Sequence, residues 1–525
     1  MGVGIHLSPP FANSITHLRN FFEMILCSGY CILYSDEGKP ESAAAGFATT
    51  GNALTDLNFA VASLRNESEE KIVNRFIRAF YEDRVLAVKW LFFLRDVRGG
   101  LGERRSFRVI FRYLAQSFPE MAGGLAVIMA EYGRFDDLLC LLGTPVEEKA
   151  LTVLKEQLEA DAEAMEKGEG ISLCAKWMPG NNTSSAESKK AAARLQSFME
   201  LTAKEYRKLL ASLRAYLQVT ETAMSDNRWG EINYEAVASR ANLLYRNAFL
   251  RHDETRRKEF LKSVQENHAV IHAGVLMPHE IITQYTDRLG WSFKVGGEDP
   301  ALELLWNNLP DTVAGAENIL CVVDGSGSML CPVGNGSTTA LHVSNALGVY
   351  FAGRMGGAYR NRFITFSSRP RYVDLSACRT LKEKLELAFS HNDCTNTNLE
   401  ATFELVLQTA LQNHLKQEEL PGTILVISDM EFDSAVSSDA DTLFDGIKKR
   451  FSCYGYRLPR LVFWNVNSRT NVVPVRENEL GVCLVSGFSV NVCRMVLSGE
   501  LNPFVCLKKI LEEERYRKVE EYLCS

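Results

Sequence analysis

Three small oxygen-bearing side chains lie at alternate positions where an apolar run ends. The segment ILCVVDGSGSM, residues 319–329, ends its apolar stretch on Asp324 and continues with Ser326 and Ser328, which are separated by glycines. Alternate spacing in an extended turn directs these three side chains to one side. Mg²⁺ prefers six oxygen ligands in octahedral geometry and keeps several waters, so one carboxylate with neutral hydroxyls suits it. The pattern therefore predicts a divalent-cation site.

Two later segments supply further oxygens at positions that would suit the same site. The segment CTNTNLEATFELVL, residues 394–407, opens a predicted helix at Thr397, and VISDMEFD, residues 426–433, ends a predicted strand on Asp429. Thr395 is an alternative hydroxyl in the first segment, although Thr397 is closer in phase to the apolar face of the helix. Together the segments predict a metal site built from Asp324 and Asp429 with serine and threonine hydroxyls.

Other chemistries fit the opening segment less well. An aspartyl phosphatase requires a second carboxylate where Ser326 stands, a nucleophile elbow requires glycine where Asp324 stands, and a phosphate-binding loop requires G-K-[ST]. The purely structural interpretation is that Asp324 caps the next helix and that the serines solvate a tight glycine turn. His391 is the one histidine close in sequence to these segments, and we expect it at the surface. No aligned base and nucleophile are evident, so we expect a binding site and no enzyme activity.

The elements that must position these residues alternate between short apolar runs and helical segments after residue 318. We expect strands at 319–324, 359–366, 422–429, 460–466 and 481–487, and helices near 340–353, 380–389, 398–413, 440–450 and 489–497. Such alternation predicts a parallel, doubly wound α/β sheet. Ligands of these sheets bind outside the carboxyl ends of the strands, where Asp324 and Asp429 both lie.

The preceding part of the chain has a different periodicity. From about residue 52 to 290, apolar residues recur at three- and four-residue spacing, which predicts amphipathic helices. Breaks at 98–103, 132–137, 178–185 and 225–232 separate helices of the length found in stacked helical pairs. We therefore expect an α-helical repeat domain over 46–312 and the α/β domain over 316–525. Residues 1–45 are expected to form a poorly ordered extension.

The α/β half resembles the von Willebrand factor A domains, a Rossmann-like fold. The order D-x-S-x-S, threonine at a helix start and aspartate at a strand end matches their metal-ion-dependent adhesion site. This resemblance implies that Ser326, Ser328 and Thr397 touch Mg²⁺ or Mn²⁺ directly, while Asp324 and Asp429 act mainly through water. It further implies that the open sixth position takes an acidic group from a partner, such as a protein carboxylate.

The helical half resembles the TROVE family of Ro ribonucleoproteins, in which HEAT-like repeats close into a ring that binds RNA. The similarity lies in LFFLRDVRGGLGERRSFRVIFRYLA, residues 91–115, and in GRFDDLL, residues 133–139. The chain is closer still to a largely uncharacterised domain-of-unknown-function family with both halves, through AKWMPG, SDNRWGEINYEAVASRA, VVDGSGSM and ISDMEFD. The resemblance implies a TROVE-like helical-repeat domain followed by a von Willebrand A-like domain.

Residues 204–262 carry twelve basic residues with interleaved aromatic residues, a combination that can grip phosphates and stack on unpaired bases. We select Arg207, Arg246 and Arg251 as candidate phosphate contacts and Tyr206 and Tyr245 as candidate stacking residues. The alternative interpretation is that these helices have solvated charged faces and keep their aromatic residues in the core. RGGLGERR, residues 98–105, is similarly either an anion-binding helix start or a plain turn between helices.

Composition limits the classes of function. The net charge of -7 over 525 residues provides no global attraction for nucleic acid, so RNA would need a local basic patch. Thirteen cysteines without a CxxC pair predict reduced thiols in a cytoplasmic protein. The apolar run at 21–34 contains Glu23 and is shorter than the roughly 20 residues that span a bilayer, so we expect no membrane partner.

These observations favour a non-enzymatic, TROVE-like binding protein. We expect structured or single-stranded RNA on its helical half, and a divalent metal with a protein carboxylate on its A domain. The alternative is a protein–protein interaction scaffold with a metal-dependent site and no RNA binding.

Overall fold

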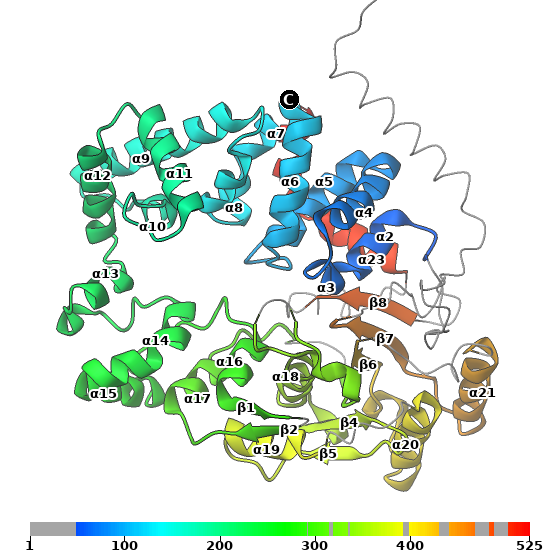
Figure 1. Ribbon diagram of the computed structural model, residues 1–525. Coiled ribbons are helices and arrows are strands. Elements are labelled where there is room, and N and C mark those ends of the chain that lie inside the picture. Colours follow the sequence, from blue (N-terminus) through cyan, green and yellow to red (C-terminus); the bar gives the residue numbers. More distant parts are fainter. Residues whose placement is uncertain are drawn as a thin grey trace, which may run out of the picture. The chain divides into compact units, whose positions relative to one another are not determined.

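The computed structural model describes residues 49–290, 292–313, 319–333, 336–391, 398–429, 440–467, 482–487 and 502–524 (Figure 1). The described part belongs to one structural unit that begins at Ala44. The expected extension at 1–45, the expected helix near 489–497 and Thr397 lie outside the described residues.

The first half of the described chain is helical, as its periodicity predicts. Its elements are α2 (Ala53–Phe59), α3 (Val61–Leu64), α4 (Glu69–Glu82), α5 (Arg84–Arg95), α6 (Arg105–Ser117), α7 (Pro119–Ala126), α8 (Met129–Tyr132), the 3-10 helix η1 (Phe135–Leu141), α9 (Glu147–Glu166), α10 (Cys174–Trp177), α11 (Ala186–Phe198), α12 (Ala203–Tyr216), α13 (Thr220–Ser225), η2 (Trp229–Glu231), α14 (Ser239–His252), α15 (Glu254–Gln265), α16 (Pro278–Tyr285) and α17 (Pro300–Asn307). An antiparallel hairpin of β1 (Thr286–Leu289) and β2 (Ser292–Val295) joins α16 to α17, which the helical pattern does not predict.

Helix α5 is the centre of this helical half. The Asp83 side chain caps its start by accepting the Leu86 N–H, a contact that satisfies one of the free amide groups of the first turn. Every residue from Leu86 to Arg95 is buried, which is typical of a helix surrounded by others. The turn that follows α5 needs glycine, because a Cβ on Gly100 would overlap with the Phe93 carbonyl.

The second half contains a six-stranded sheet. In chain order the strands are β3 (Ile319–Asp324), β4 (Arg362–Phe366), β5 (Tyr372–Asp374), β6 (Thr423–Ser428), β7 (Arg460–Asn465) and β8 (Val482–Ser486). Their order in the sheet is β5-β4-β3-β6-β7-β8. Only the edge strand β5 is antiparallel to its neighbour among these described strands. The five expected strands are therefore present, and β5 is an addition that makes the sheet mixed.

Helices cover both faces of this sheet. They are α18 (Ala340–Ala352), α19 (Leu381–Phe389), α20 (Leu399–Gln412) and α21 (Ala440–Cys453), with the 3-10 helices η3 (Gly327–Leu330), η4 (Gly357–Tyr359) and η5 (Gln417–Glu419). Alternate residues of β3 belong to two clusters: Leu320 and Val322 pack with α20, whereas Cys321 and Val323 share a cluster with α18. This division is the doubly wound arrangement, in which strands buried on both faces read as continuous apolar runs.

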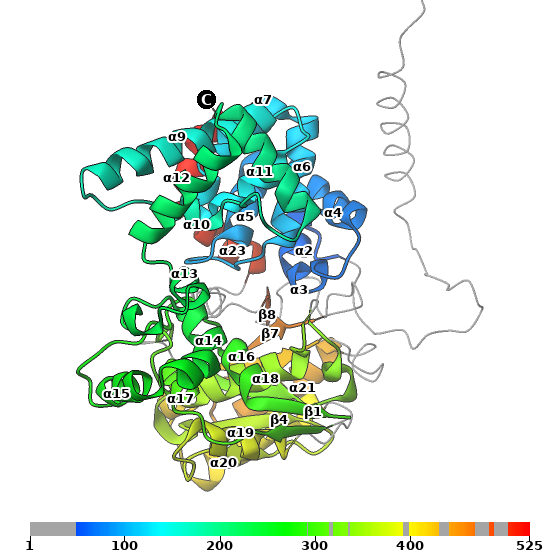
Figure 2. The ribbon, with the colours of Figure 1, turned by 60° about the vertical axis from the view of Figure 1, so that its left-hand side comes forward.

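The last two helices pack into the helical half. Helix α23 (Pro503–Leu511) contacts α2 and α5, and α24 (Glu514–Cys524) contacts α5 and α7, as two views of the ribbon also show for α23 (Figures 1 and 2). The expected α/β domain at 316–525 thus contains two helices that complete the core of the other half.

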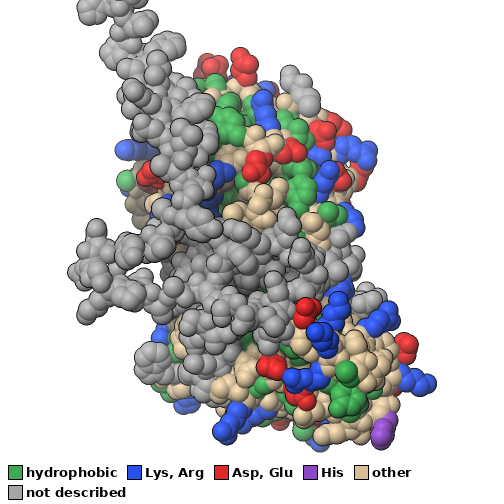
Figure 3. Space-filling model, turned by 90° about the vertical axis from the view of Figure 1, so that its right-hand side faces the viewer, with side chains coloured by type: hydrophobic (Ala, Val, Ile, Leu, Met, Phe, Trp, Pro, Cys, Tyr) green, Lys and Arg blue, Asp and Glu red, His purple; other side chains and the backbone are tan. Residues whose placement is uncertain are grey.

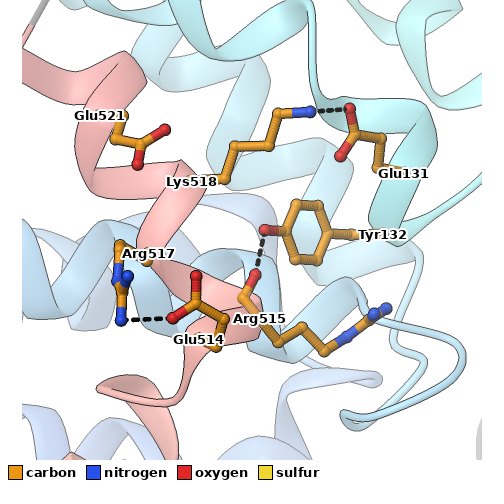
Figure 4. A pocket seen from close by; sticks show the side chains of 7 residues that line it. All are labelled: Glu131, Tyr132, Glu514, Arg515, Arg517, Lys518 and Glu521. Atoms are coloured by element: carbon orange, nitrogen blue, oxygen red, sulfur yellow. Dashed lines mark hydrogen bonds and ion pairs between the residues drawn. The ribbon is translucent and has the colours of Figure 1, made fainter.

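A buried carboxylate anchors α24. Asp96, fully buried after α5, accepts hydrogen bonds from Arg515 Nη2 at 2.6 Å and from the Tyr516 hydroxyl at 3.0 Å. Around this contact, the Tyr132 hydroxyl donates to the Arg515 carbonyl at 2.6 Å, and Lys518 pairs with Glu131 (Figure 4). Most of the charges that line this hollow of about 420 Å³ are thus already in ion pairs, two of them between lining residues and one with Asp96.

No helix among the described residues is long and apolar enough to cross a membrane. One face of the molecule shows acidic and basic side chains interspersed on its described part (Figure 3). A mixed surface of this kind agrees with the modest net charge of -7.

Candidate functional site

The sheet brings Asp324 and Asp429 to one edge. Asp324 is the last residue of β3, Asp429 directly follows β6, and the two strands are parallel neighbours with Val323 opposite Ile427. Both carboxylates are nearly inaccessible, with 2% and 1% exposure. Strand order reverses at this place, because β4 lies on one side of β3 and β6 on the other. In doubly wound sheets, this switch point is where ligands bind.

Hydrogen bonds fix the orientation of the Asp324 carboxylate. Its Oδ1 accepts the backbone N–H of Ser326 at 2.9 Å, and its Oδ2 accepts the hydroxyl of Ser428 at 2.5 Å. The first bond closes the glycine turn over the end of β3, so the turn and the strand end form one unit. Ser428 was not predicted from the sequence as part of the site. Its position at the end of the strand, immediately before Asp429, could have indicated it.

The two serine hydroxyls are close enough to share one cation. Ser326 Oγ and Ser328 Oγ are 2.9 Å apart, and both residues are partly exposed. Two neighbouring oxygens of an octahedron around Mg²⁺, each at about 2.0–2.1 Å from the ion, are separated by about 2.9 Å. The present spacing therefore fits adjacent ligands of one ion without rearrangement of the turn.

The donor set is composed of hydroxyls and carboxylates. Among the residues that the structure describes, no group of three or more His, Cys, Asp or Glu side chains is placed to hold a metal. A cation at this edge would therefore depend on the serine hydroxyls as much as on the carboxylates. Neutral oxygens of this kind suit a hard ion such as Mg²⁺ or Mn²⁺ rather than a thiophilic one.

The start of α20 lies near the same edge. Thr397 and its alternative Thr395 lie outside the described residues. The adjacent Asn398 donates its backbone N–H to the Ser367 carbonyl at 3.2 Å, and Ser367 follows Phe366, the register partner of Asp324. Asn398 also caps α20 by accepting the Ala401 N–H at 2.9 Å. The start of α20 is thus anchored one strand away from Asp324.

The helical half contacts the carboxyl ends of two further strands, β7 and β8. Asn465, the last residue of β7, donates its side-chain N–H to the Phe59 carbonyl at 3.2 Å, and Ser486 of β8 accepts the Ala62 N–H at 3.2 Å. These buried bonds attach the junction of α2 and α3 to strands β7 and β8. No pattern in the sequence announces them, since more than 400 residues separate the partners.

The candidate RNA contacts separate into buried and exposed residues. Tyr206 is fully buried, and its hydroxyl donates to the Pro179 carbonyl at 3.0 Å, so no base can stack on this ring while the helix stays packed. Arg246 is 8% exposed and pairs with Asp299 at 2.9 Å, so its charge is already neutralised. Arg207 and Arg251 are exposed, and Tyr245 is half-buried. The structure therefore keeps only the last three in reach of a ligand.

Most of the basic residues between 204 and 262 hold an oxygen of the protein itself. These are Arg214, Arg228, Arg240, Arg246, Arg256, Arg257, Lys258 and Lys262. Within the described part of the chain, no ion pair forms at Lys204, Arg207, Lys208 or Arg251. The basic patch that the sequence predicts is thereby reduced to four side chains, three of them on α12.

The fold and this edge define a class of protein: a helical half joined to a doubly wound α/β domain with hydroxyl and carboxylate oxygens at its switch point. Comparison with protein families agrees with the division. Residues 180–316 match a domain of unknown function, DUF2828, and residues 318–521 match a second one, DUF7788.

Two individual proteins match most of the length of this chain. An uncharacterized protein, L728 of Acanthamoeba polyphaga mimivirus, is 29% identical over 504 residues, which cover 88% of this chain and 85% of the viral protein. Among solved structures, the Ro (RSR) protein of Deinococcus radiodurans matches 87% of this chain and 94% of its own, with 15% identity and a TM-score of 0.35.

Proposed function

We propose that this chain is a non-enzymatic binding protein whose α/β domain holds a divalent cation and, through it, an acidic group of a partner. The observation that supports this proposal most directly is the 2.9 Å separation of the Ser326 and Ser328 hydroxyls beside the buried carboxylate of Asp324. This arrangement agrees with the metal-ion-dependent adhesion site of von Willebrand A domains, which the sequence resembles.

Each residue of the site has a separate task in this proposal. Ser326, Ser328 and Thr397 would supply hydroxyl oxygens to Mg²⁺ or Mn²⁺, and Asp324 and Asp429 would supply negative charge, directly or through water. When bound, the cation offers a coordination position to a carboxylate from outside. The hydrogen bond from Ser428 holds Asp324 in a fixed orientation, which lowers the ordering cost of binding the ion.

The hydrogen bonds of the serines favour binding over catalysis. A serine nucleophile needs a base that accepts its proton, whereas the described partner of Ser326 Oγ is the Ser328 hydroxyl. His342, buried in the first turn of α18, is engaged with Thr286 and Thr339. We therefore assign no reaction to this edge.

Calorimetry with Mg²⁺ and Mn²⁺ tests the metal site. Asp324→Ala would leave Ser428 and the Ser326 N–H without their buried acceptor, so a loss of binding in this variant alone could reflect unfolding. Ser328→Ala removes one ligand from a partly exposed position and is the better probe. We expect its affinity for Mn²⁺ to fall at least tenfold, with unchanged circular dichroism. Ser376→Ala, at an exposed serine after β5, is the matched control. Equal Mn²⁺ affinities of the unmodified chain, Ser328→Ala and Ser376→Ala would refute the site.

RNA binding by the helical half is a second candidate function. The exposed cations Lys204, Arg207 and Lys208 on α12, together with Arg251 on α14, support it because they are not neutralised by described carboxylates. The experiment is filter binding of mixed cellular RNA over a range of salt. Each phosphate contact adds a slope of about -0.7 in log K against log salt for single strands.

A pair of variants separates the RNA proposal from the protein-scaffold alternative. Arg207→Ala with Arg251→Ala should flatten the salt slope by about 1.4 if both side chains contact phosphates. Lys258→Ala is the control, because Lys258 already pairs with Glu254 at 2.6 Å. Absence of RNA binding at low salt would instead support a scaffold that binds only proteins.

A further inference from the structure

A pocket of about 720 Å³ lies between helices α6, η1 and α11 and the segment after α10. Its volume is in the range of about 300–1,000 Å³ that is typical of small-molecule sites. It is distant in sequence from the sheet edge described above and shares no residue with it.

Basic side chains dominate the charge of the walls. Arg108 and Arg112 come from α6, and Lys190 and Arg194 come from α11, against the two carboxylates of Asp136 and Glu187. Arg194 is paired with Glu147 at 2.7 Å. Arg108 pairs with Asp136 at 3.0 Å and with the buried Asp137 at 2.7 Å.

These pairings leave two cations for a ligand. Among the described residues no carboxylate pairs with Arg112 or Lys190, both of which are exposed on their helices. Asp136 is already held by Arg134 and Arg108. Burial would raise the pKa of Asp136, but the hydrogen bond from Arg134 and the charge of Arg108 outweigh burial and hold the pKa below its ordinary value. Glu187 has no ion pair among the described residues either, so two unpaired cations, one from α6 and one from α11, face one carboxylate, and the pocket keeps a surplus of positive charge.

A tryptophan forms part of the wall. The half-buried Trp177 lines the pocket, and the Arg134 guanidinium lies over its ring at 3.7 Å from the centroid. Apolar side chains such as Leu139 and Met178 lie beside it. An aromatic wall next to unpaired cations suits a ligand that has both a planar ring and an anionic group.

Helix α12 supports this wall from outside the pocket. Arg214 donates from Nε to the Ala175 carbonyl at 2.9 Å and from Nη2 to the Met178 carbonyl at 2.6 Å. The Tyr206 hydroxyl donates to the Pro179 carbonyl at 3.0 Å. The segment that carries Trp177 is thus attached to a neighbouring helix at three carbonyls, which limits the reorganisation that a bound ligand would require.

The thiol in the pocket is not poised for chemistry. Burial raises the pKa of Cys140 to about 12, so the sulfur stays protonated at neutral pH and is a weak nucleophile. This observation favours binding over covalent capture of a ligand.

We propose that this pocket binds a nucleotide, with the phosphate between Arg112 and Lys190 and the base against Trp177. The nucleotide is either free or the phosphorylated end of a single strand, since both present the same chemistry. The proposal does not depend on the metal site, and it concerns a different surface from the exposed cations of α12 and α14.

Fluorescence anisotropy and calorimetry with the full chain test this proposal. The probes are adenosine monophosphate, a ten-nucleotide oligoadenylate with a 5′-phosphate, the same strand with a 5′-hydroxyl, and an acidic peptide of similar charge. We expect the phosphorylated strand or the mononucleotide to bind. Affinity for the mononucleotide indicates a free nucleotide as the ligand, and affinity for the phosphorylated strand alone indicates a strand end.

Variants locate the binding. Arg112→Ala with Lys190→Ala should lower the affinity at least tenfold, and Lys189→Ala, an exposed neighbour on α11 outside the pocket, should stay within twofold. Trp177→Leu should weaken binding about five- to 150-fold, from the usual contribution of one base stack. Lys190→Glu changes an exposed side chain, so this test does not depend on whether the Trp177→Leu variant folds. It should abolish binding of the phosphorylated probe.

Three outcomes would overturn the proposal: no binding of either phosphorylated probe at millimolar concentration, equal affinity in the Arg112→Ala, Lys190→Ala double variant, or binding of the acidic peptide in preference to the nucleotides. Ser328→Ala should bind the probes as the unmodified chain does. Loss of metal binding and loss of nucleotide binding are therefore separable results.

Discussion

Replacing Asp96 by asparagine should loosen the attachment of α24 to the helical half. Asp96 is fully buried and accepts from Arg515, from Tyr516 and from the Arg98 backbone N–H at 2.9 Å. Burial alone would raise its pKa, but the hydrogen bonds from Arg515 and the backbone outweigh burial, and the pKa lies below its ordinary value. The carboxylate is therefore charged at neutral pH and stabilises the fold in that form.

The magnitude follows from the partners. Asparagine keeps the shape and one acceptor oxygen but loses the charge, and hydrogen bonds to charged groups contribute about 1.5–3 kcal/mol. Because a third of the Arg515 side chain remains exposed, we expect a loss near 2 kcal/mol. Arg515→Met should cost more, about 3 kcal/mol, because it leaves Asp96 buried without its cation. The double variant should recover part of that loss.

Urea unfolding followed by circular dichroism measures these free energies of unfolding. Arg517→Met is the matched control on the same helix, since its pair with Glu514 is exposed at both ends and such pairs contribute about 0.5 kcal/mol or less. A lowered folded pKa also means that the stabilisation is full above the unfolded pKa near 3.9 and is lost as pH falls below it. The reasoning fails if Asp96→Asn and Arg517→Met have the same stability, or if the double variant shows no coupling.

Three further predictions concern the core and the thiols. Burial lowers the pKa of His342 to about 4, so the folded protein favours the neutral imidazole. The free energy of unfolding should therefore be highest above pH 6.5 and should fall by about 3 kcal/mol as pH falls towards 4. An NMR titration of His342 with a midpoint near 6.5 would contradict this. Gly348→Ala should destabilise the protein by about 1–3 kcal/mol in a urea titration, because its Cβ would lie 2.5 Å from Val323 Cγ2; Gly446→Ala, which meets no atom within 4 Å, should have far less effect. Titration of the denatured, unreduced protein should count close to thirteen thiols, in keeping with the seven described free cysteines; a count lower by several would indicate disulfides.

The sheet was predictable because its strands are continuous runs of branched apolar residues. β3 and β7 begin where the sequence predicts, whereas β4 begins three residues later than expected, at Arg362. The delay has a local cause: Asn361 adopts a left-handed conformation with φ 58°, so the strand cannot start before it. β5 has three residues, too few for an alternating pattern to be recognised.

The candidate site was predictable in part for the same reason. Asp324 and Asp429 end apolar runs, and the carboxyl ends of adjacent parallel strands meet at one edge. The burial of Tyr206 was also readable, because Tyr206 precedes Leu210 and Leu213 by four and seven residues on one face of α12. The pairing of Arg246 with Asp299 was not, since the partners are 53 residues apart and meet only in the folded chain.

The packing of α24 against α5 has a consequence for how the protein is made. Arg515 is synthesised 419 residues after Asp96, a delay of about 20–80 s at ordinary rates of translation. During that interval the apolar surface of α5 that α23 and α24 later cover has no native partner from this chain. A nascent chain of this design would offer a binding surface to chaperones until its final helices leave the ribosome, and premature termination would leave the helical half incomplete even though all of its own helices had been made.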